Sequence, residues 1–182
     1  LLTLKGTPFL YYGEEIGMQG KKPDEQIRTP MQWSNELNGG FTSGSPWEYL
    51  AIGYKTANVA VESEDPASLL SLYRKLIKIR LQHKAFLDGE YIKVTTSAPA
   101  LYASLSRSGD EILLTLVNLK VADVATPKLT FFGADLDGAY TLTPLLVPEE
   151  GSQQIQIAGS SFTLSGSIPG GYNQIYLVTK NK

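Results

Sequence analysis

Within residues 6–33, carboxylates and an arginine follow directly after a short apolar run. Glu14 and Glu15 are adjacent, and Arg28 follows in the same polar segment. Glycoside hydrolysis uses two carboxylates about 5–10 Å apart around the substrate bond. An arginine offers a planar fork to a carboxylate or to sugar hydroxyls. Glu14, Glu15 and Arg28 are therefore the candidate substrate-binding residues.

The two glutamates cannot form that catalytic pair together, because adjacent residues leaving a strand point to opposite sides. Either one binds backbone amides of the loop while the other pairs with Arg28, or one of them also lines a sugar subsite. Arg28 either orients a loop carboxylate or touches substrate. Trp33 and Trp47 could stack on a pyranose ring, but we expect them to pin their loop to the fold.

Residues 9–12 are a continuous apolar run between Pro8 and Gly13. Such a run predicts a strand covered on both faces, as in a parallel sheet wrapped by helices. The loop at the carboxyl end of a parallel strand is where these folds hold their functional residues. Residues 34–60 are predicted to form an ordered irregular loop, because they combine turn formers with aromatic side chains that need packing partners.

A helix is predicted over residues 66–83. Asp65 is a suitable N-cap and Pro66 a suitable first helical residue. The apolar residues that repeat at helical spacing are Leu69, Leu72, Leu76 and Ile79. We expect this stripe to be buried, either on the aromatic residues of 34–60 or against a second copy of the chain, which makes a homo-oligomer through this helix an expected partner.

From Gly89 onward, short alternating runs are separated by turn signals. The candidate strands are residues 90–96, 100–106, 111–118, 128–132, 139–145, 152–157, 161–165 and 174–179. Tight turns are predicted at 108–110 and 158–160. This spacing of short strands predicts an antiparallel β-sandwich of Greek-key type with its own core.

Composition narrows the class of protein. The chain has 182 residues, of which 42% are hydrophobic and 19% charged, which is typical of a globular protein. It lacks an apolar run long enough to cross a membrane, and its net charge of −2 gives no basic footprint for nucleic acid. With no Cys and a single histidine, His83, which we expect to be solvated at a helix end, no metal site is expected. Asp135 and Asp137 are expected to form a turn rather than a calcium site.

Four motifs within residues 6–47 occur in an order typical of a known family. They are Gly-Thr-Pro-Phe-Leu-Tyr-Tyr-Gly-Glu-Glu-Ile-Gly-Met from Gly6, Arg-Thr-Pro-Met-Gln-Trp from Arg28, Gly-Phe-Thr from Gly40, and Pro46-Trp47. This order resembles glycoside hydrolase family 13, the α-amylase family, near its α-amylases, oligo-1,6-glucosidases and trehalose synthases. The resemblance implies that residues 1–86 are the last strand, active-site loop and last helix of a (β/α)8 barrel, and residues 87–182 a carboxyl-terminal antiparallel Greek-key β-sandwich.

The same resemblance implies that the catalytic residues lie outside the chain. In the family, the nucleophile, the general acid and the third carboxylate follow the fourth, fifth and seventh barrel strands, whereas residues 7–13 resemble the eighth. Residues 1–6 are also predicted to be the last turn of a helix capped by Gly6. The parent is therefore expected to be a retaining α-glucan-active hydrolase of α-amylase or α-glucosidase type, and this chain alone is expected to be inactive.

The resemblance also implies an α-glucan or malto-oligosaccharide as the substrate of the parent. No cofactor is expected in this chain, although the parent could hold calcium. Two alternatives stay open: a carbohydrate-binding or structural β-domain without catalysis, and a fragment of a trehalose synthase-type transglycosylase. The first needs exposed, coplanar aromatic residues, and those to check are Tyr102, Tyr140, Phe162 and Tyr176. Without an amino-terminal segment to interpret, the sequence leaves the localisation undetermined.

Overall fold

The computed structural model describes residues 1–181, which divide into two compact units. One unit, which we call the β unit, comprises Leu1–Thr7 together with the chain from Lys78 onward. The other, the loop unit, is Pro8–Ile77. The helix α2 (Leu69–Gln82) belongs to both, since it continues across the boundary between Ile77 and Lys78.

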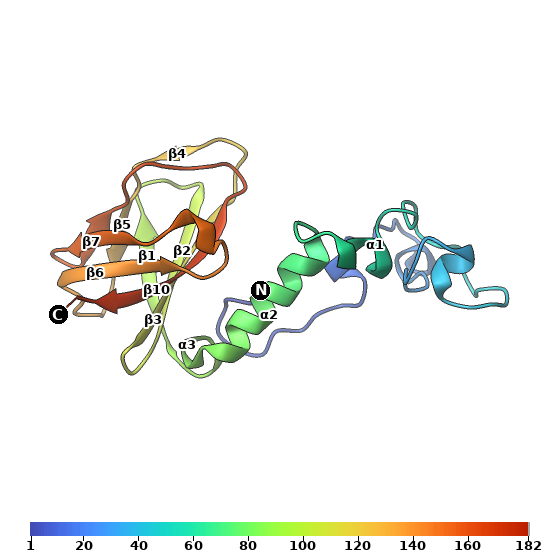
Figure 1. Cartoon of the computed structure of the whole chain (residues 1–182), viewed down its shortest axis with the longest axis horizontal. Helices are drawn as coiled ribbons and strands as arrows, with labels where there is room; N and C mark the ends of the chain where they lie inside the picture. Colours follow the sequence, from blue (N-terminus) through green and yellow to red (C-terminus); the bar gives the residue numbers. More distant parts are fainter. Residues whose placement is uncertain (182) are drawn as a thin grey trace. The chain divides into compact units, whose positions relative to one another are not determined.

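The β unit is built on an eight-stranded antiparallel sheet in the order β7-β6-β10-β3-β2-β1-β5-β8. These strands are β1 (Glu90–Thr96), β2 (Leu101–Ser108), β3 (Glu111–Asn118), β5 (Lys128–Phe131), β6 (Gly138–Pro144), β7 (Gln153–Ile157), β8 (Ser161–Thr163) and β10 (Asn173–Lys180). The short strands β4 (Val124–Ala125) and β9 (Ser167–Ile168) pair with each other. The sheet thus brings the last strand, β10, between β3 and β6, as Figure 1 shows.

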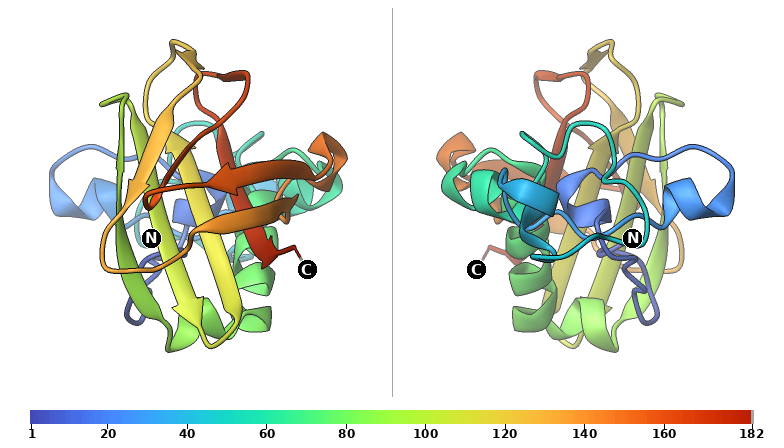
Figure 2. Two further views of the ribbon diagram at one scale, coloured as in Figure 1. Left: turned by 90° about the vertical axis from the view of Figure 1, so that its left-hand side faces the viewer. Right: turned by 90° about the vertical axis from the view of Figure 1, so that its right-hand side faces the viewer.

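The sheet bends within β1 and nearly closes. The first half of β1 pairs with β2 (Glu90 opposite Arg107) and its second half pairs with β5 (Val94 opposite Phe131). At the other end, the edge strands β7 and β8 meet through a turn closed by an Ala158–Ser161 bridge. Strands β1, β2 and β3 lie side by side in Figure 2, in green to yellow.

The concave face of this sheet holds the core of the β unit. Its fully buried side chains include Leu105, Leu114, Leu116, Leu129, Leu142, Leu164 and Tyr176. They come from strands on both sides of the bend, and alternate residues on each strand point into the core, as a period of two requires. The predicted antiparallel β domain with its own core is therefore confirmed.

All eight predicted strands are present within a few residues of their predicted ends. The turn between β2 and β3 has Ser108 opposite Glu111, with Gly109 at a φ of 60°, as predicted for a two-residue hairpin. Strands β4 and β9 were not predicted, because two residues are too few to show an alternating pattern.

Helix α2 confirms the predicted helix, but it begins at Leu69 rather than at Pro66. The Asp65 carboxylate accepts a hydrogen bond from the Ala67 amide and forms a turn before the helix. Ser68 is the actual cap, since its hydroxyl oxygen accepts from the Ser71 amide at 3.1 Å. A further short helix, α1 (Val59–Glu64), lies just before this turn, where the sequence predicted only loop.

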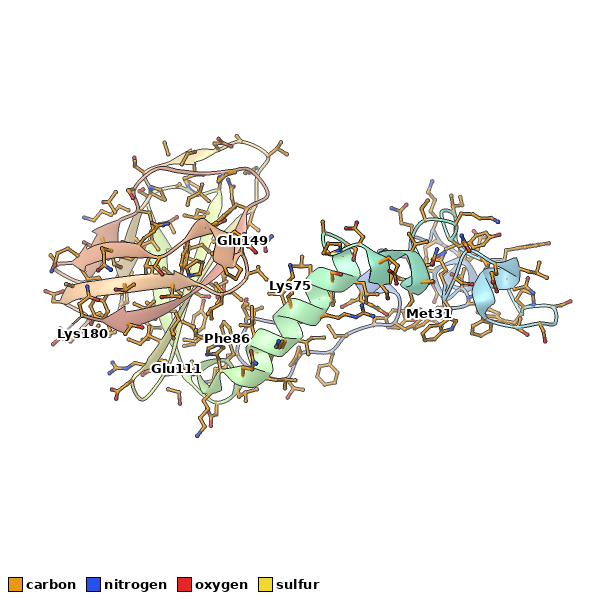
Figure 3. All side chains as sticks on the ribbon, in the orientation of Figure 1. Met31, Lys75, Phe86, Glu111, Glu149 and Lys180 are labelled. Carbon is orange, nitrogen blue, oxygen red and sulfur yellow. The ribbon has the colours of Figure 1, made fainter. Side chains whose placement is uncertain are left out.

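The apolar stripe of α2 is only partly buried. Its exposure varies along the helix: Ile79 is buried, Leu72 and Leu76 are half-buried, and Leu69 is 39% exposed. The buried helix residue in the loop unit is Leu70, which packs with Ile16 and with Met31, labelled in Figure 3. The cluster that buries Leu70 thus contains none of the aromatic residues of 34–60, which were one of the two predicted partners of the helix.

The short helix α3 (Lys84–Leu87) follows α2 and is capped by a side chain from β3. The Glu111 carboxylate accepts a hydrogen bond from the Ala85 amide and contacts His83 Nδ1, both at 2.8 Å. Figure 3 labels Glu111 beside Phe86, which is buried. The expectation of a solvated His83 is wrong, because the carboxylate at this helix start holds the ring in place.

Two predicted elements of the first 13 residues are not formed. Residues 9–12 are not a strand, and the Phe9 side chain is 84% exposed. A parallel strand needs hydrogen-bonded neighbours on its edges, and no strand of the described chain precedes β1. Residues 1–6 form a turn, with a 3.2 Å bond from the Leu4 amide to the Leu1 carbonyl, instead of a helix end. Among residues 1–181, no helix has the length and apolar character needed to cross a membrane.

Candidate functional site

Glu14 and Glu15 both lie in a single 3-10 turn, η1 (Glu14–Ile16), of the loop unit. Glu14 Oε1 accepts a hydrogen bond from the Tyr73 hydroxyl at 3.3 Å. Burial raises the pKa of Tyr73, and the charges of Glu14 and Glu15 raise it further. Both carboxylates therefore raise the pKa of the same hydroxyl group. The strand end from which they were expected to point to opposite sides is replaced by η1.

A cavity of about 340 Å³ lies beside this pair of carboxylates. It is lined by Leu10, Tyr11, Tyr12, Glu15, Tyr73 and Arg74, among others. Glu15 thus faces a cavity whose other polar groups are tyrosine hydroxyls and a guanidinium. Hydroxyl and charged groups around an apolar wall are suited to holding a hydroxyl-rich ligand.

Tyr12 connects this cavity with the segment that carries Arg28. Its hydroxyl donates a hydrogen bond to the Thr29 carbonyl at 2.9 Å, and its ring lies 4.9 Å from that of Tyr11. Burial and the neighbouring Tyr11 raise the pKa of Tyr12, while the positive charge of Arg28 opposes the rise. Tyr12 is therefore close to both groups of predicted residues, although the sequence showed it only as part of an apolar run.

Arg28 pairs with Asp24 rather than with either glutamate. Its Nη2 lies 3.0 Å from Asp24 Oδ2, and the Arg28 side chain is 60% exposed. Lys22 contacts the other oxygen of the same carboxylate. The carboxylate that Arg28 orients is thus one that the sequence analysis had not singled out, and part of the guanidinium still faces solvent.

A second cavity, of about 450 Å³, is lined in part by residues that neighbour Arg28 in the sequence. Its lining includes Lys21, Gln26, Thr29, Glu48, Tyr49 and Ala51. Charges of both signs, an amide and a hydroxyl surround an exposed aromatic ring, because Tyr49 is 86% exposed. This mixture can donate to and accept from the hydroxyls of a neutral ligand.

The two tryptophans are exposed. Trp33 is 51% exposed and Trp47 61%, so the expectation that their side chains pin the loop is wrong for this unit. The loop is held by its backbone instead, through the 2.8 Å bond from the Trp33 amide to the Gly39 carbonyl. Gln32, beside Trp33, is fully buried, and its Oε1 has no hydrogen-bond partner among the described residues.

Within residues 1–181, no group of three or more His, Cys, Asp or Glu side chains could hold a metal ion. Asp137 instead closes a turn, since its two oxygens accept from the Gly159 and Ser160 amides at 3.1 and 3.0 Å. The Ser160 amide, followed by the Gly159 amide, lowers the pKa of this carboxyl.

The four aromatic residues of the β unit that were named as a possible stacking platform do not form one. Tyr140, Phe162 and Tyr176 are buried. Tyr102 is half-buried, and its hydroxyl lies 3.3 Å from that of Tyr91 on the neighbouring strand. Flat stacking of a sugar on these side chains is therefore not available in this conformation.

Comparison with known proteins gives a family match for the first half of the chain. Residues 1–89 match the family model "Alpha amylase, catalytic domain". An oligo-1,6-glucosidase of Heyndrickxia coagulans is 33% identical over 153 residues, which cover 64% of this chain and 28% of that protein. A trehalose-6-phosphate hydrolase of Bacillus subtilis (strain 168) is 28% identical over 188 residues, which cover 84% of this chain and 31% of that protein.

Solved structures match nearly the whole chain. The trehalose-6-phosphate hydrolase of Bacillus licheniformis superposes with a TM-score of 0.71 at 25% identity, and the match covers 99% of this chain and 37% of that one. The chain therefore spans about a third of the length of the proteins that it matches. The resemblance that the motifs of residues 6–47 indicated is confirmed.

Proposed function

We propose that this chain, whose residues 1–89 match the α-amylase catalytic-domain model, is the carboxyl-terminal part of a retaining glycoside hydrolase that cleaves α-glucosidic bonds in α-glucans or malto-oligosaccharides. The observation that carries the proposal is the family match, together with relatives named as oligo-1,6-glucosidase and trehalose-6-phosphate hydrolase. On this proposal, residues 1–86 complete a (β/α)8 barrel and residues 87–182 form its carboxyl-terminal β-domain.

The strand order of the β unit supports a Greek-key arrangement within that domain. Strands β1, β2 and β3 follow one another through hairpins, and β5 returns to lie beside β1. Three consecutive strands with a fourth beside the first make up this motif. The bend within β1 supports the division of the strands into two packed layers.

The proposed role of the loop unit is to contact substrate. We assign this role to Glu14, Glu15 and Arg28. Glu15 lines a cavity, and Glu14 shares the Tyr73 hydroxyl beside it. Arg28 keeps part of its guanidinium exposed while Asp24 orients it. Carboxylates accept from sugar hydroxyls and a guanidinium donates to them, so these groups can position a glucosyl unit without taking part in bond cleavage.

The bond-breaking groups are proposed to come from residues outside this chain. In retaining hydrolysis, one carboxylate attacks the anomeric carbon while a carboxylic acid protonates the leaving oxygen, and water then releases the sugar. The tyrosine-bound Glu14 and its neighbour Glu15 sit in one short turn rather than on opposite sides of a substrate bond. The isolated chain should therefore show no hydrolysis.

The test is an activity assay of the protein made from the complete reading frame, beside the 182-residue chain. The complete protein should release glucose from isomaltose, maltotriose or trehalose 6-phosphate, and the short chain should release none. Arg28→Ala in the complete protein should raise KM several-fold, whereas Arg107→Ala, a change of the same type on β2 of the β unit, should change KM less.

Two results would overturn the proposal. One is a complete protein that cleaves none of the three α-glucosides. The other is hydrolysis by the short chain that disappears in Glu14→Gln or Glu15→Gln. Formation of trehalose from maltose, without net hydrolysis, would favour the transglycosylase alternative.

A homo-oligomer through α2 stays a prediction, which the exposed side chains of Leu69 and Leu81 support.

A further inference from the structure

A third cavity, of about 330 Å³, lies in the β unit between η4 (Pro148–Glu150), the start of β7 and the segment 164–172. Its polar lining is Glu150, Gln153, Ser165, Ser167 and Tyr172. Its apolar wall comes from Leu164, Ile168 and the ring of Tyr176, all of which are buried. The volume is at the lower end of the roughly 300–1,000 Å³ that small-molecule sites occupy.

A chain of hydrogen bonds organises one side of this cavity. The Tyr172 hydroxyl donates to Glu150 Oε2 at 2.5 Å, and Gln174 Nε2 donates to the same oxygen at 3.0 Å. Since the Tyr172 proton is committed to Glu150, the Tyr176 hydroxyl is the donor in its 3.0 Å contact with Tyr172. Burial and the bond to Glu150 raise the pKa of Tyr172, so its hydroxyl stays protonated at neutral pH.

These bonds leave unused acceptor capacity on two residues that line the cavity. Glu150 Oε2 accepts two bonds, whereas Glu150 Oε1 accepts none from the residues that the structure describes. The hydroxyl of Ser165 likewise has no partner in residues 1–181, and it is exposed. The cavity therefore offers a fixed carboxylate oxygen and a rotating hydroxyl group beside an apolar wall.

The charges of the lining narrow the ligand class. No Lys or Arg lines the cavity, so a phosphate or carboxylate ligand would meet Glu150 without a compensating charge. Glu150 is also the only carboxylate in the lining, whereas calcium takes six to eight oxygen ligands that usually include several carboxylates. A neutral ligand rich in hydroxyls, with an apolar ring face, fits both the polar and the apolar walls.

We propose that this cavity is a carbohydrate-binding site that holds one pyranose unit, with Glu150 Oε1 and Ser165 bonding to its hydroxyls and Ile168 facing its C–H side. The inference does not rest on the proposed hydrolase activity, because every residue of the site lies in the β unit. It also differs from a stacking platform, since the sugar would enter a cavity and bond through its hydroxyls instead of lying flat on exposed aromatic rings.

The experiment is a titration of the isotope-labelled 182-residue chain with maltose, followed by amide chemical shifts. Maltose should shift the amides of Glu150 and of residues 164–168, with saturation in the millimolar range. Glu150→Gln and Ser165→Ala should each weaken binding about fivefold, as the loss of one hydrogen bond predicts. Ser165 is exposed on a loop, so its variant should keep the fold even if Glu150→Gln does not.

Matched controls separate the site from general effects. Glu149→Gln removes the same charge from the same turn without touching the cavity; Glu149 is labelled in Figure 3. Ser160→Ala removes a serine hydroxyl elsewhere in the β unit. Both should bind maltose as the parent chain does. The proposal is overturned if maltose shifts no amide around the cavity, if glycerol gives the same shifts at equal hydroxyl concentration, or if Ser165→Ala binds maltose with unchanged affinity.

Discussion

The two units of the molecule differ in how much of their apolar surface they bury. In the β unit, side chains from both sheets meet in one core, where Leu116, Leu129 and Leu142 are fully buried. In the loop unit, a small cluster of Ile16, Met31 and Leu70 is buried. Many of its larger apolar side chains, such as Phe9, are exposed.

This difference follows from where each unit finds its partners. Every strand of the β unit pairs with strands of the same unit, so its hydrogen bonds and its apolar faces are satisfied locally. The loop unit carries motifs of a catalytic-domain family of which the chain spans only part. We expect the stability of the chain to come mainly from the β unit, and the following predictions test that expectation.

The largest effect is expected for Leu116→Ala in β3. Leu116 is fully buried in the core, so truncation removes its burial and leaves a cavity, which should lower the free energy of unfolding by about 3 kcal/mol. Leu37→Ala makes the same change at a residue of the loop unit that is 79% exposed and should cost less than about 0.5 kcal/mol. Urea denaturation measures both. Equal losses would show that the units do not differ as described.

A smaller effect is expected for Arg80→Lys. The buried Arg80 guanidinium donates to the carbonyls of Leu2, Leu4 and Gly6, and so attaches the first residues to the end of α2. A lysine cannot reproduce this fork, and the variant should lose about 2 kcal/mol in urea denaturation. Arg74→Lys is the control, because Arg74 donates one bond at the surface. A variant at position 80 as stable as the parent would contradict this role.

The smallest effect concerns the acid side of the pH profile. The Ser160 and Gly159 amides lower the pKa of Asp137 below its ordinary 3.8. The folded state therefore favours the charged form, and this stabilisation is present above pH 3.8 and lost as the pH falls through the lowered pKa. Asp137→Asn should flatten the fall in Tm between pH 5 and pH 3. Asp135→Asn, with the same charge change, lacks those bonds; an equal flattening there would refute the assignment.

How far the sequence predicted the fold depended on the range of the interactions. The strands of the β unit were predicted because alternation is a local pattern, and their partners lie in the same chain. The strand at residues 9–12 was wrong because its stability depends on neighbouring strands that the described residues do not supply. The helix start at Leu69 was missed because Asp65 and Ser68 both suit a cap, and the choice depends on the hydrogen bonds that each one makes.

In the candidate site too, local contacts could be predicted from the sequence, whereas contacts between distant residues could not. The pairing of Arg28 with Asp24 could have been predicted, because residues four apart approach each other in a turn of helix. The contacts of Tyr12 with Thr29 and of Tyr73 with Glu14 join distant residues, and no local pattern predicts them. The proposed substrate contacts of Glu14, Glu15 and Arg28 remain predictions until the complete protein is assayed.

Amide hydrogen exchange of the 182-residue chain tests the contrast between the units most directly. Amides of β2, β3 and β10 should exchange slowest, at rates set by global unfolding, because these central strands are paired on both sides. Amides of residues 9–57 should exchange far sooner, through local opening. The account would be contradicted if residues 9–12 were protected as strongly as β3, because the loop unit would then have a stable core of its own.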